Sequence, residues 1–254
     1  MQGHEDLALL TDTVRAAGAI ARQYFGTDYR HWRKEGGSPV TEADIAVNRF
    51  LCERLTAARP DYGWLSEESP DDPARLTRHK VFVIDPIDGT VAFLKGRPHF
   101  TVCAAVVTAG RPCCGAVYNP ASDELYAARA GGGATRNGTP IQVGARAQLQ
   151  GCRMLGRRDV LTLPPWPPMD VQNRNSLAYR LALVADGSAD ASVSLTAKRD
   201  WDLAAADIIL SEAGGVVSDI HGRPLAYNNA HAVQPSLVAA NAGLHAQIIG
   251  LLRQ

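Results

Sequence analysis

The strongest constraint on how this chain folds is residues 81–90, where four apolar residues are followed by Asp-Pro-Ile-Asp-Gly-Thr. The apolar run is long enough for a buried strand. Pro86 cannot donate a hydrogen bond to a sheet, so the strand is predicted to end near Asp85. Asp85 and Asp88 are therefore expected on a tight turn at the carboxyl end of a buried strand.

The residues after this turn indicate what the two carboxylates do. Gly89 permits unusual backbone angles or the close approach of a ligand, and residues 90–94 can begin a helix whose free N–H groups suit a phosphate. Two carboxylates would repel that phosphate unless cations lie between them, and oxygen ligands favour Mg2+ or a similar ion. The alternative is a loop in which Asp85 caps a helix and Asp88 is solvated. That alternative carries about equal weight for the bare D-x-x-D-G spacing.

Two helices are predicted before the strand. Apolar residues recur at spacings of three and four from Leu7 to Tyr24, which is typical of an amphipathic helix. Thr41 is a suitable N-cap for a second helix, and Asp44 three positions later fits a capping pattern. Capping alone would account for Asp44. Residues 29–40, between the helices, are expected to form a short extended arm or hairpin.

After the aspartate turn, antiparallel strands joined by turns are predicted over residues 101–108, 114–118, 124–130 and 135–143. Residues 144–150 are polar and lack periodicity, which predicts a domain boundary there. It separates an N-terminal α+β half, residues 1–145, from a C-terminal α/β half, residues 146–254. In the second half we expect an irregular loop at 161–168, helices at 175–186 and 244–252, and strands at 191–195, 216–218 and 237–240.

Two more acidic segments stand out. Glu67 and Glu68 lie in an acidic stretch that a solvated loop would also explain. Asp202 lies in the first turn of a helix predicted to begin at Trp201 and to end at a Gly-Gly pair, where the helix dipole favours a carboxylate.

Charge and cysteine content exclude several classes of function. Lys plus Arg and Asp plus Glu both number 26, and a net charge of zero argues against a nucleic-acid-coating surface. No apolar run reaches the length of a membrane span, and the acidic N-terminus lacks the pattern of a signal peptide. Five cysteines without a C-x-x-C pair indicate reduced thiols. A cytoplasmic protein is predicted.

Four of these segments together resemble the inositol monophosphatase superfamily, which comprises Mg2+-dependent, lithium-sensitive phosphomonoesterases. The signatures are Asp85-Pro86-Ile87-Asp88-Gly89-Thr90 and Trp201-Asp202 with its Gly-Gly end, and residues 38–44 and 61–69 match two further family segments. The resemblance runs from about Asp12 to Asn241. It implies a five-layer αβαβα sandwich with the site between its two halves.

The resemblance also implies ligands for two or three Mg2+ ions. One ion would be held by Glu67, Asp85 and the backbone carbonyl of Ile87, and a second by Asp85, Asp88 and Asp202. A third, weaker ion would sit on Glu67 through water. Such ions activate water for in-line attack on a phosphate monoester and stabilise the leaving oxygen.

The remaining roles follow from the same resemblance. Asp44 would hydrogen-bond Thr90, and this pair, with Glu67, would serve catalysis by orienting the attacking water. The phosphate would be bound by Asp88 and by the N–H groups of Gly89 and Thr90.

The resemblance does not point to a single substrate, because different segments match different members of the superfamily. Inositol phosphatases carry a glutamate seven positions before the second-signature aspartate, and this chain has Leu195 there, which we take to be buried and unable to accept a hydrogen bond. Residues 38–44 and 176–185 look more like 3′(2′),5′-bisphosphate nucleotidases, although Val-Ala-Phe replaces the usual Lys-Glu-Phe after Asp-Gly-Thr. Lys198 and Arg199 are candidates for a second phosphate, with a surface charge as the alternative for each.

We therefore predict hydrolysis of adenosine 3′,5′-bisphosphate or a related nucleotide, with the loop around Trp166 as a candidate contact for the base. The alternatives are inositol 1-phosphate, a sugar bisphosphate and histidinol phosphate. A function of another class, a protein-binding scaffold without essential catalysis, would be expected to have lost metal ligands, and this chain keeps them. The expected ligand is a small phosphate ester, and a homodimer is compatible with the resemblance.

Overall fold

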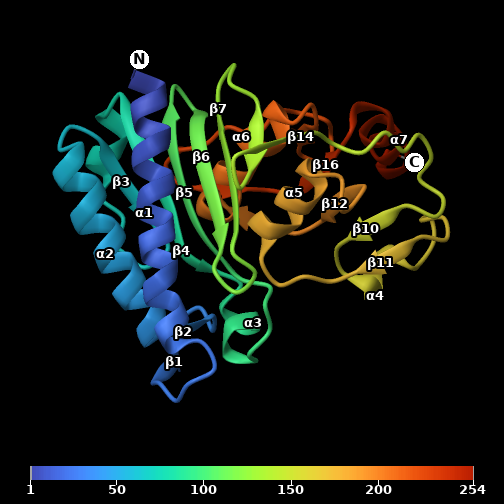
Figure 1. Cartoon of the computed structure of the whole chain (residues 1–254). Helices are drawn as coiled ribbons and strands as arrows, with labels where there is room; N and C mark the ends of the chain where they lie inside the picture. Colours follow the sequence, from blue (N-terminus) through green and yellow to red (C-terminus); the bar gives the residue numbers. More distant parts are fainter. Residues whose placement is uncertain (1, 254) are drawn as a thin grey trace.

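The computed structural model describes residues 2–253 and folds them into alternating layers of helix and sheet, five in all (Figure 1). The first layer holds α1 (Gln2–Tyr24) and α2 (Glu42–Ala58), the two amphipathic helices expected from the sequence. Between them a hairpin of β1 (His31–Arg33) and β2 (Pro39–Thr41) forms the predicted arm.

The second layer is a seven-stranded sheet in the order β3-β4-β5-β6-β7-β8-β9. Its β3 and β4 are parallel, and the later pairs are antiparallel. The strands are β3 (Gly63–Ser66), β4 (Lys80–Asp88), β5 (Thr101–Thr108), β6 (Arg111–Asn119), β7 (Glu124–Arg129), β8 (Ala134–Arg136) and β9 (Thr139–Ile141).

Two strand predictions in this sheet were wrong in detail. Strand β4 does not end near Asp85 but continues through Pro86 to Asp88. Its register against β5 shifts between Asp85 and Asp88, so Pro86 does not need to donate a hydrogen bond to the neighbouring strand. The strand expected at 135–143 is instead a tight hairpin. Asn137 and Gly138 have φ values of 49° and 80°, as a two-residue Asn-Gly turn requires.

The third layer consists of α5 (Leu177–Ala185) and α6 (Asp200–Glu212), between the two sheets (Figure 1). The fourth is a five-stranded sheet in the order β11-β10-β12-β16-β14, and α7 (Ala242–Leu252) covers its outer face. Its strands are β10 (Arg153–Leu155), β11 (Asp170–Gln172), β12 (Ala191–Ser194), β14 (Val216–Ser218) and β16 (Leu237–Ala240). The remaining elements are the 3-10 helix η1 (Pro73–Thr77), α3 (Thr90–Leu94), α4 (Arg158–Leu161), and the paired strands β13 (Lys198–Arg199) and β15 (Val233–Gln234).

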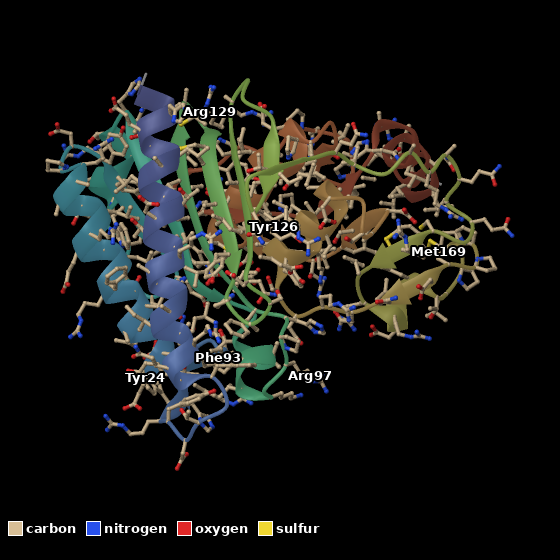
Figure 2. The ribbon with its side chains drawn as sticks, viewed as in Figure 1. Tyr24, Phe93, Arg97, Tyr126, Arg129 and Met169 are labelled. Carbon is tan, nitrogen blue, oxygen red and sulfur yellow. The ribbon has the colours of Figure 1, made fainter. Side chains whose placement is uncertain are left out.

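Three apolar cores hold these layers together. One lies between α1, α2 and the seven-stranded sheet and includes Phe93, and another lies between the five-stranded sheet and α7. The largest joins both sheets through α5 and α6. It includes Tyr126, labelled in Figure 2, whose hydroxyl donates to Asp186 at the end of α5 (2.9 Å). The boundary at 145/146 falls between β9 and β10 and stays a prediction. No helix within residues 2–253 has both the length and the apolar character needed to span a bilayer.

Candidate metal centre

Three carboxylates from distant parts of the chain meet between the two sheets. Asp85 and Asp88 lie at the end of β4, and Asp202 lies in the first turn of α6. One oxygen from each lies within 4.8 Å of the others. The same cavity, of about 200 Å3, is also lined by Glu67, Ile87, Gly89 and Thr90. The structure thus brings together the residues that the sequence proposed as metal ligands and phosphate contacts.

The charges in this cluster are strongly perturbed. Burial, and then the neighbouring charges of Glu67, Asp88 and Asp202, raise the pKa of Asp85 well above its usual value. Burial and then the charge of Asp88 raise the pKa of Asp202 to about 8. Burial raises the pKa of Asp88 to about 6 against the opposing effect of its hydrogen bonds. Carboxylates packed in this way are costly unless a cation compensates them.

One atom tests whether a metal fits. Oδ1 of Asp85 is buried and has no hydrogen-bond partner among the residues that the structure describes. An orphaned carboxylate oxygen facing other carboxylates, with no nitrogen or sulfur ligand in the group, matches the donor set of a hard cation such as Mg2+. The residues present therefore fit the ion that the sequence implied.

Helix α5 holds Asp88 in place. Oδ2 of Asp88 accepts hydrogen bonds from Oγ of Ser176 (2.6 Å) and from the backbone N–H of Ala178 (2.7 Å). Ser176 is also the N-cap of α5, accepting from the N–H of Tyr179. Neither bond to Asp88 uses its Oδ1. Sequence reasoning missed Ser176 in this role, since nothing local links it to residue 88.

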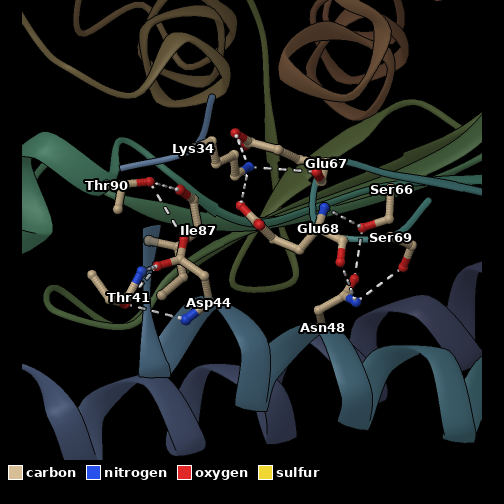
Figure 3. A network of polar contacts seen from close by, with 10 residues as sticks. All are labelled: Lys34, Thr41, Asp44, Asn48, Ser66, Glu67, Glu68, Ser69, Ile87 and Thr90. Atoms are coloured by element: carbon tan, nitrogen blue, oxygen red, sulfur yellow. Dashed lines mark hydrogen bonds and ion pairs between the residues drawn. The ribbon is translucent and has the colours of Figure 1, made fainter. Parts of the chain in front are cut away.

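Asp44 satisfies both interpretations given to it (Figure 3). Its Oδ2 accepts from the backbone N–H of Thr41 (2.7 Å) and completes a capping box on α2. Its Oδ1 lies 3.4 Å from Oγ1 of Thr90, which is also 3.1 Å from the carbonyl oxygen of Ile87. Burial, more than the charges of Glu68 and Glu67, raises the pKa of Asp44 to about 7. The cap thus aims the second oxygen at Thr90.

A lysine that the sequence did not single out reaches the edge of the cluster. Lys34, in the β1–β2 hairpin, places Nζ 3.0 Å from Oε1 of Glu67 and 2.6 Å from Oε1 of Glu68 (Figure 3). Burial acts to lower the pKa of Lys34, but the bond to Glu68 and the charge of Glu67 prevail and raise it. The Glu68 side chain is 5% exposed, so it is not a surface charge.

A second cavity, of about 300 Å3, adjoins the first and shares Asp88, Asn175 and Asp202 with it. Its other lining residues are three cations, five apolar side chains and the polar residues Asn173, Ser194 and Thr196. The cations are Arg157, Arg180 and Lys198, and the apolar side chains are Val160, Leu161, Leu177, Val193 and Leu195. If a phosphate ester binds with its phosphate at the carboxylates, the rest of that molecule would occupy this second cavity.

Three expectations about substrate contacts need correction. Leu195 lines this cavity but is 40% exposed rather than buried. Arg199 does not line it, because its guanidinium donates to the carbonyl of His231 (3.2 Å) and lies over the Trp201 ring. Trp166 packs into the core beneath α7 and is 8% exposed.

Arg157 and Arg180 are the cavity cations that sequence reasoning missed. Arg180 follows Ser176 by one helical turn, so the two share a face of α5. Because Ser176 was itself missed, this spacing could not have identified Arg180 from the sequence. Its guanidinium donates to the carbonyl of Arg174 (2.5 Å) and to Oδ1 of Asn173 (2.8 Å). Burial lowers the pKa of Arg180, against the attraction of Asp88.

The chain is similar to known proteins in both sequence and fold. Residues 4–254 match the inositol monophosphatase family. The chain is 31% identical to the 3′(2′),5′-bisphosphate nucleotidase CysQ of Aggregatibacter actinomycetemcomitans, over 91% of each chain. It is 35% identical to an inositol-1-monophosphatase of Mesorhizobium japonicum, over 84% of each. Its fold superposes on the extragenic suppressor protein suhB of Bartonella henselae with a TM-score of 0.86 at 26% identity, covering 98% of this chain and 99% of that one. The chain therefore belongs to the inositol monophosphatase family, whose members are hydrolases of phosphate monoesters.

Proposed function

We propose that the carboxylate cluster is a Mg2+-dependent phosphomonoesterase site, with Asp85, Asp88 and Asp202 as the central ligands. Glu67 and Ile87 line the same cavity and would complete the set for two or three ions, Ile87 through its backbone carbonyl. The observation that carries this proposal is Oδ1 of Asp85, which is buried amid other carboxylates and has no hydrogen-bond partner within residues 2–253. When bound, Mg2+ supplies an activated water and stabilises the leaving oxygen.

The chain's own residues position the other reactants. Thr90 Oγ1 lies between the Ile87 carbonyl and Asp44, so it is held where it can orient the attacking water. Gly89 has φ of 96°, and a Cβ there would come within 2.7 Å of the carbonyl oxygen of His99. Glycine is therefore needed for the turn that presents the N–H groups of residues 89 and 90 to a phosphate.

For the substrate we propose a nucleotide 3′(2′),5′-bisphosphate such as adenosine 3′,5′-bisphosphate. Three cations in the second cavity suit a second phosphate, and the apolar side chains beside them suit a base. An inositol monophosphate has no second phosphate for these cations and would find Leu195 where a polar anchor is needed. Histidinol phosphate carries a positive charge of its own, which the same cations disfavour. A sugar bisphosphate remains the second candidate, because it too has two phosphates.

A protein-binding scaffold is the alternative from another class of function. Clustered, buried carboxylates without a compensating charge lower the stability of the fold. A protein that acted only as a scaffold would have no use for such a cluster. We also propose that the enzyme works in the cytoplasm, in keeping with its five free thiols.

The test is a phosphate-release panel in Mg2+ with adenosine 3′,5′-bisphosphate, adenosine 3′-monophosphate, inositol 1-phosphate, fructose 1,6-bisphosphate and histidinol phosphate. We expect kcat/KM for the nucleotide bisphosphate to exceed that for inositol 1-phosphate by at least about tenfold, or roughly 1.4 kcal/mol. EDTA should abolish turnover, and Li+ should inhibit it. Turnover that persists in metal-free buffer would refute the metal mechanism, and an inositol 1-phosphate rate that equals the nucleotide rate would refute the substrate.

Two neighbouring variants sharpen the substrate test. Lys198→Met should lower kcat/KM for adenosine 3′,5′-bisphosphate but not for adenosine 3′-monophosphate, because Lys198 lines the cavity. Arg199→Met is the matched control, since its side chain turns away toward His231. Leu195→Glu should raise relative activity on inositol 1-phosphate.

A further inference from the structure

A buried arginine that is not itself a candidate ligand ties together two of the elements that deliver the carboxylates. Arg75 lies in η1, and its side chain is 1% exposed. Its guanidinium forms a two-pronged pair with Asp71, from Nε to Oδ1 (2.6 Å) and from Nη2 to Oδ2 (2.9 Å). Burying a cation this completely is costly, so each of its donors needs an acceptor.

The other donors of Arg75 reach across to the C-terminal part of the chain. Nη1 donates to Oδ1 of Asn228 (2.6 Å), and Nη2 donates to the carbonyl of Asn229 (3.1 Å). Asn228 has φ of 58°, a conformation that asparagine tolerates and most residues avoid. The contact therefore depends on a loop held in an unusual shape.

Asn228 in turn contacts the first residue of α6. Its backbone N–H donates to Oδ2 of Asp200 (2.7 Å), and Nε2 of Gln234 donates to Oδ1 of the same residue (2.7 Å). Asp200 is fully buried and is the first residue of α6, two positions before Asp202. Fixing Asp200 therefore fixes the helix turn that carries a proposed metal ligand.

At its other end the link reaches the strand before Glu67. A Cβ on Gly63 would come within 3.0 Å of Cβ of Arg75 and 3.1 Å of its Cα, so Arg75 packs directly on the start of β3. Strand β3 ends at Ser66, immediately before Glu67. Arg75 thus packs against the strand that leads to Glu67 and is joined by hydrogen bonds, through Asn228 and Asp200, to the helix that carries Asp202.

We propose that Arg75, acting through Asn228 and Asp200, is a positioning residue that holds Asp202 against the β4 carboxylates and so sets metal affinity. One oxygen of Asp202 lies within 4.8 Å of oxygens of Asp85 and Asp88, a spacing at which ionised carboxylates repel one another, and the first turn of α6 would relax away from β4 without a restraint. Preforming the site removes that rearrangement from the free energy of metal binding. The inference rests on the metal centre proposed above.

The test compares two variants that each cut a contact between the parts of the chain. Asn228→Gly keeps the positive φ but removes the acceptor for Arg75. Glu212→Ala removes a contact at the opposite end of α6, where the Glu212 carboxylate accepts from the N–H groups of Gly131 (2.8 Å) and Gly133 (2.9 Å). Arg75→Met is a harsher companion, and Asn228→Gly keeps the test valid if Arg75→Met does not fold.

Binding of Mn2+, used as the probe ion, is measured by titration calorimetry on each full-length protein, and melting temperature is measured in EDTA. We expect Asn228→Gly to bind Mn2+ about tenfold more weakly than wild type and Glu212→Ala to bind like wild type. At saturating metal, kcat of Asn228→Gly should recover to near the wild-type value. Wild-type Mn2+ affinity in Asn228→Gly, or an equal loss in Glu212→Ala, would overturn the positioning role. Failure of the wild type to bind Mn2+ would instead refute the metal centre itself.

Discussion

At the scale of single residues, two aspartates of the candidate site use one carboxylate oxygen for hydrogen bonds that hold the side chain in place and leave the other oxygen for a second contact. In Asp88, Oδ2 is engaged by Ser176 and Ala178, and in Asp44, Oδ2 caps a helix while Oδ1 faces Thr90. A side chain held by one oxygen has little rotational freedom. The other oxygen is then presented in a fixed direction, as ligand binding requires.

Replacing Asp88 tests this division. In Asp88→Asn, the amide oxygen can still accept from Ser176 and Ala178, so the protein should fold with near wild-type stability. The amide nitrogen then replaces the other carboxylate oxygen and cannot bind a cation. We expect kcat/KM to fall by at least about 100-fold, or roughly 2.7 kcal/mol, measured by phosphate release at saturating Mg2+. A rate close to wild type would remove Asp88 from the ligands.

Replacing Ser176 separates its cap from its hold on Asp88. Ser176→Ala should cost about 1 kcal/mol of stability as a lost N-cap. It should also lower kcat/KM about tenfold, because Asp88 loses a donor. Asn241→Ala, which removes the N-cap of α7, is the control and should cost stability without changing kcat/KM. Equal kinetics in the two variants would show that Ser176 is only a cap.

The residues of the site that could be predicted from the sequence are those in contiguous signatures. Asp85 and Asp88 are three positions apart on one turn, so their proximity is local. Lys34 and Arg180 reach the site from a hairpin and from a helix face, and their closeness to the carboxylates is created only by tertiary packing. The prediction that Arg199 contacts the substrate was wrong for the same reason. Of the adjacent pair Lys198 and Arg199, only Lys198 lines the cavity.

At the scale of elements, the position of α6 against the seven-stranded sheet brings Asp202 to β4. Gly115 on β6 makes this approach possible, since a Cβ there would lie 2.6 Å from the carbonyl oxygen of Ala205 and 2.8 Å from Cγ2 of Ile208. Contacts this short with backbone cannot be relieved by a side-chain rotation.

Gly115→Ala should therefore push α6 away from the sheet and lower stability by about 2 kcal/mol. Gly250→Ala in α7 is the matched control, because a Cβ there meets nothing within 4 Å. That variant should be stabilised by up to about 1 kcal/mol through helix propensity. Denaturation by urea measures both. A neutral Gly115→Ala would mean that the helix–sheet contact is looser than the structure has it.

Elements with a strong periodic pattern were predictable, and those shaped by their partners were not. Helices α1 and α2 followed their apolar spacing, and the capping box at Thr41 was legible in the sequence. Strands β10 and β11 have three residues each and no alternation that stands out, so only their parallel pairing defines them. The continuation of β4 through Pro86 depends on a shift in its register against β5, which the local sequence did not predict.

At the scale of the whole molecule, the layers create a buried cluster of negative charge that the fold must stabilise. The carboxylates come from β4, in the seven-stranded sheet, and from α6, in the helical layer that packs against that sheet. The five-layer arrangement was expected from the family resemblance rather than from periodicity, and the structure confirms it. The number of ions is not fixed by the sequence, since it depends on distances that the packing sets.

The last prediction concerns how Mg2+ and pH together govern stability. Burial raises the folded-state pKa of Asp88 to about 6, and burial together with neighbouring charges raises the pKa of Asp202 to about 8 and that of Asp85 as well, against an unfolded value of about 3.9. Without metal, the folded protein holds more protons than the unfolded chain above about pH 4. Stability from these groups is therefore present at low pH and lost as pH rises through the folded pKa values. Mg2+ favours the ionised carboxylates and should remove this loss. The burial-lowered pKa values of His99 and His245 affect both conditions alike.

Melting temperatures between about pH 5 and pH 8, with EDTA or with saturating Mg2+, should therefore diverge as pH rises, Mg2+ being the more stabilising. Asp202→Asn removes one of the titrating groups and part of the ion's affinity. In EDTA this variant should melt above the wild type at pH 8 and close to it at pH 5, and Mg2+ should stabilise it less. Parallel wild-type curves across the range would mean that these carboxylates neither repel one another in the free protein nor bind the ion, and the proposed centre would have to be abandoned.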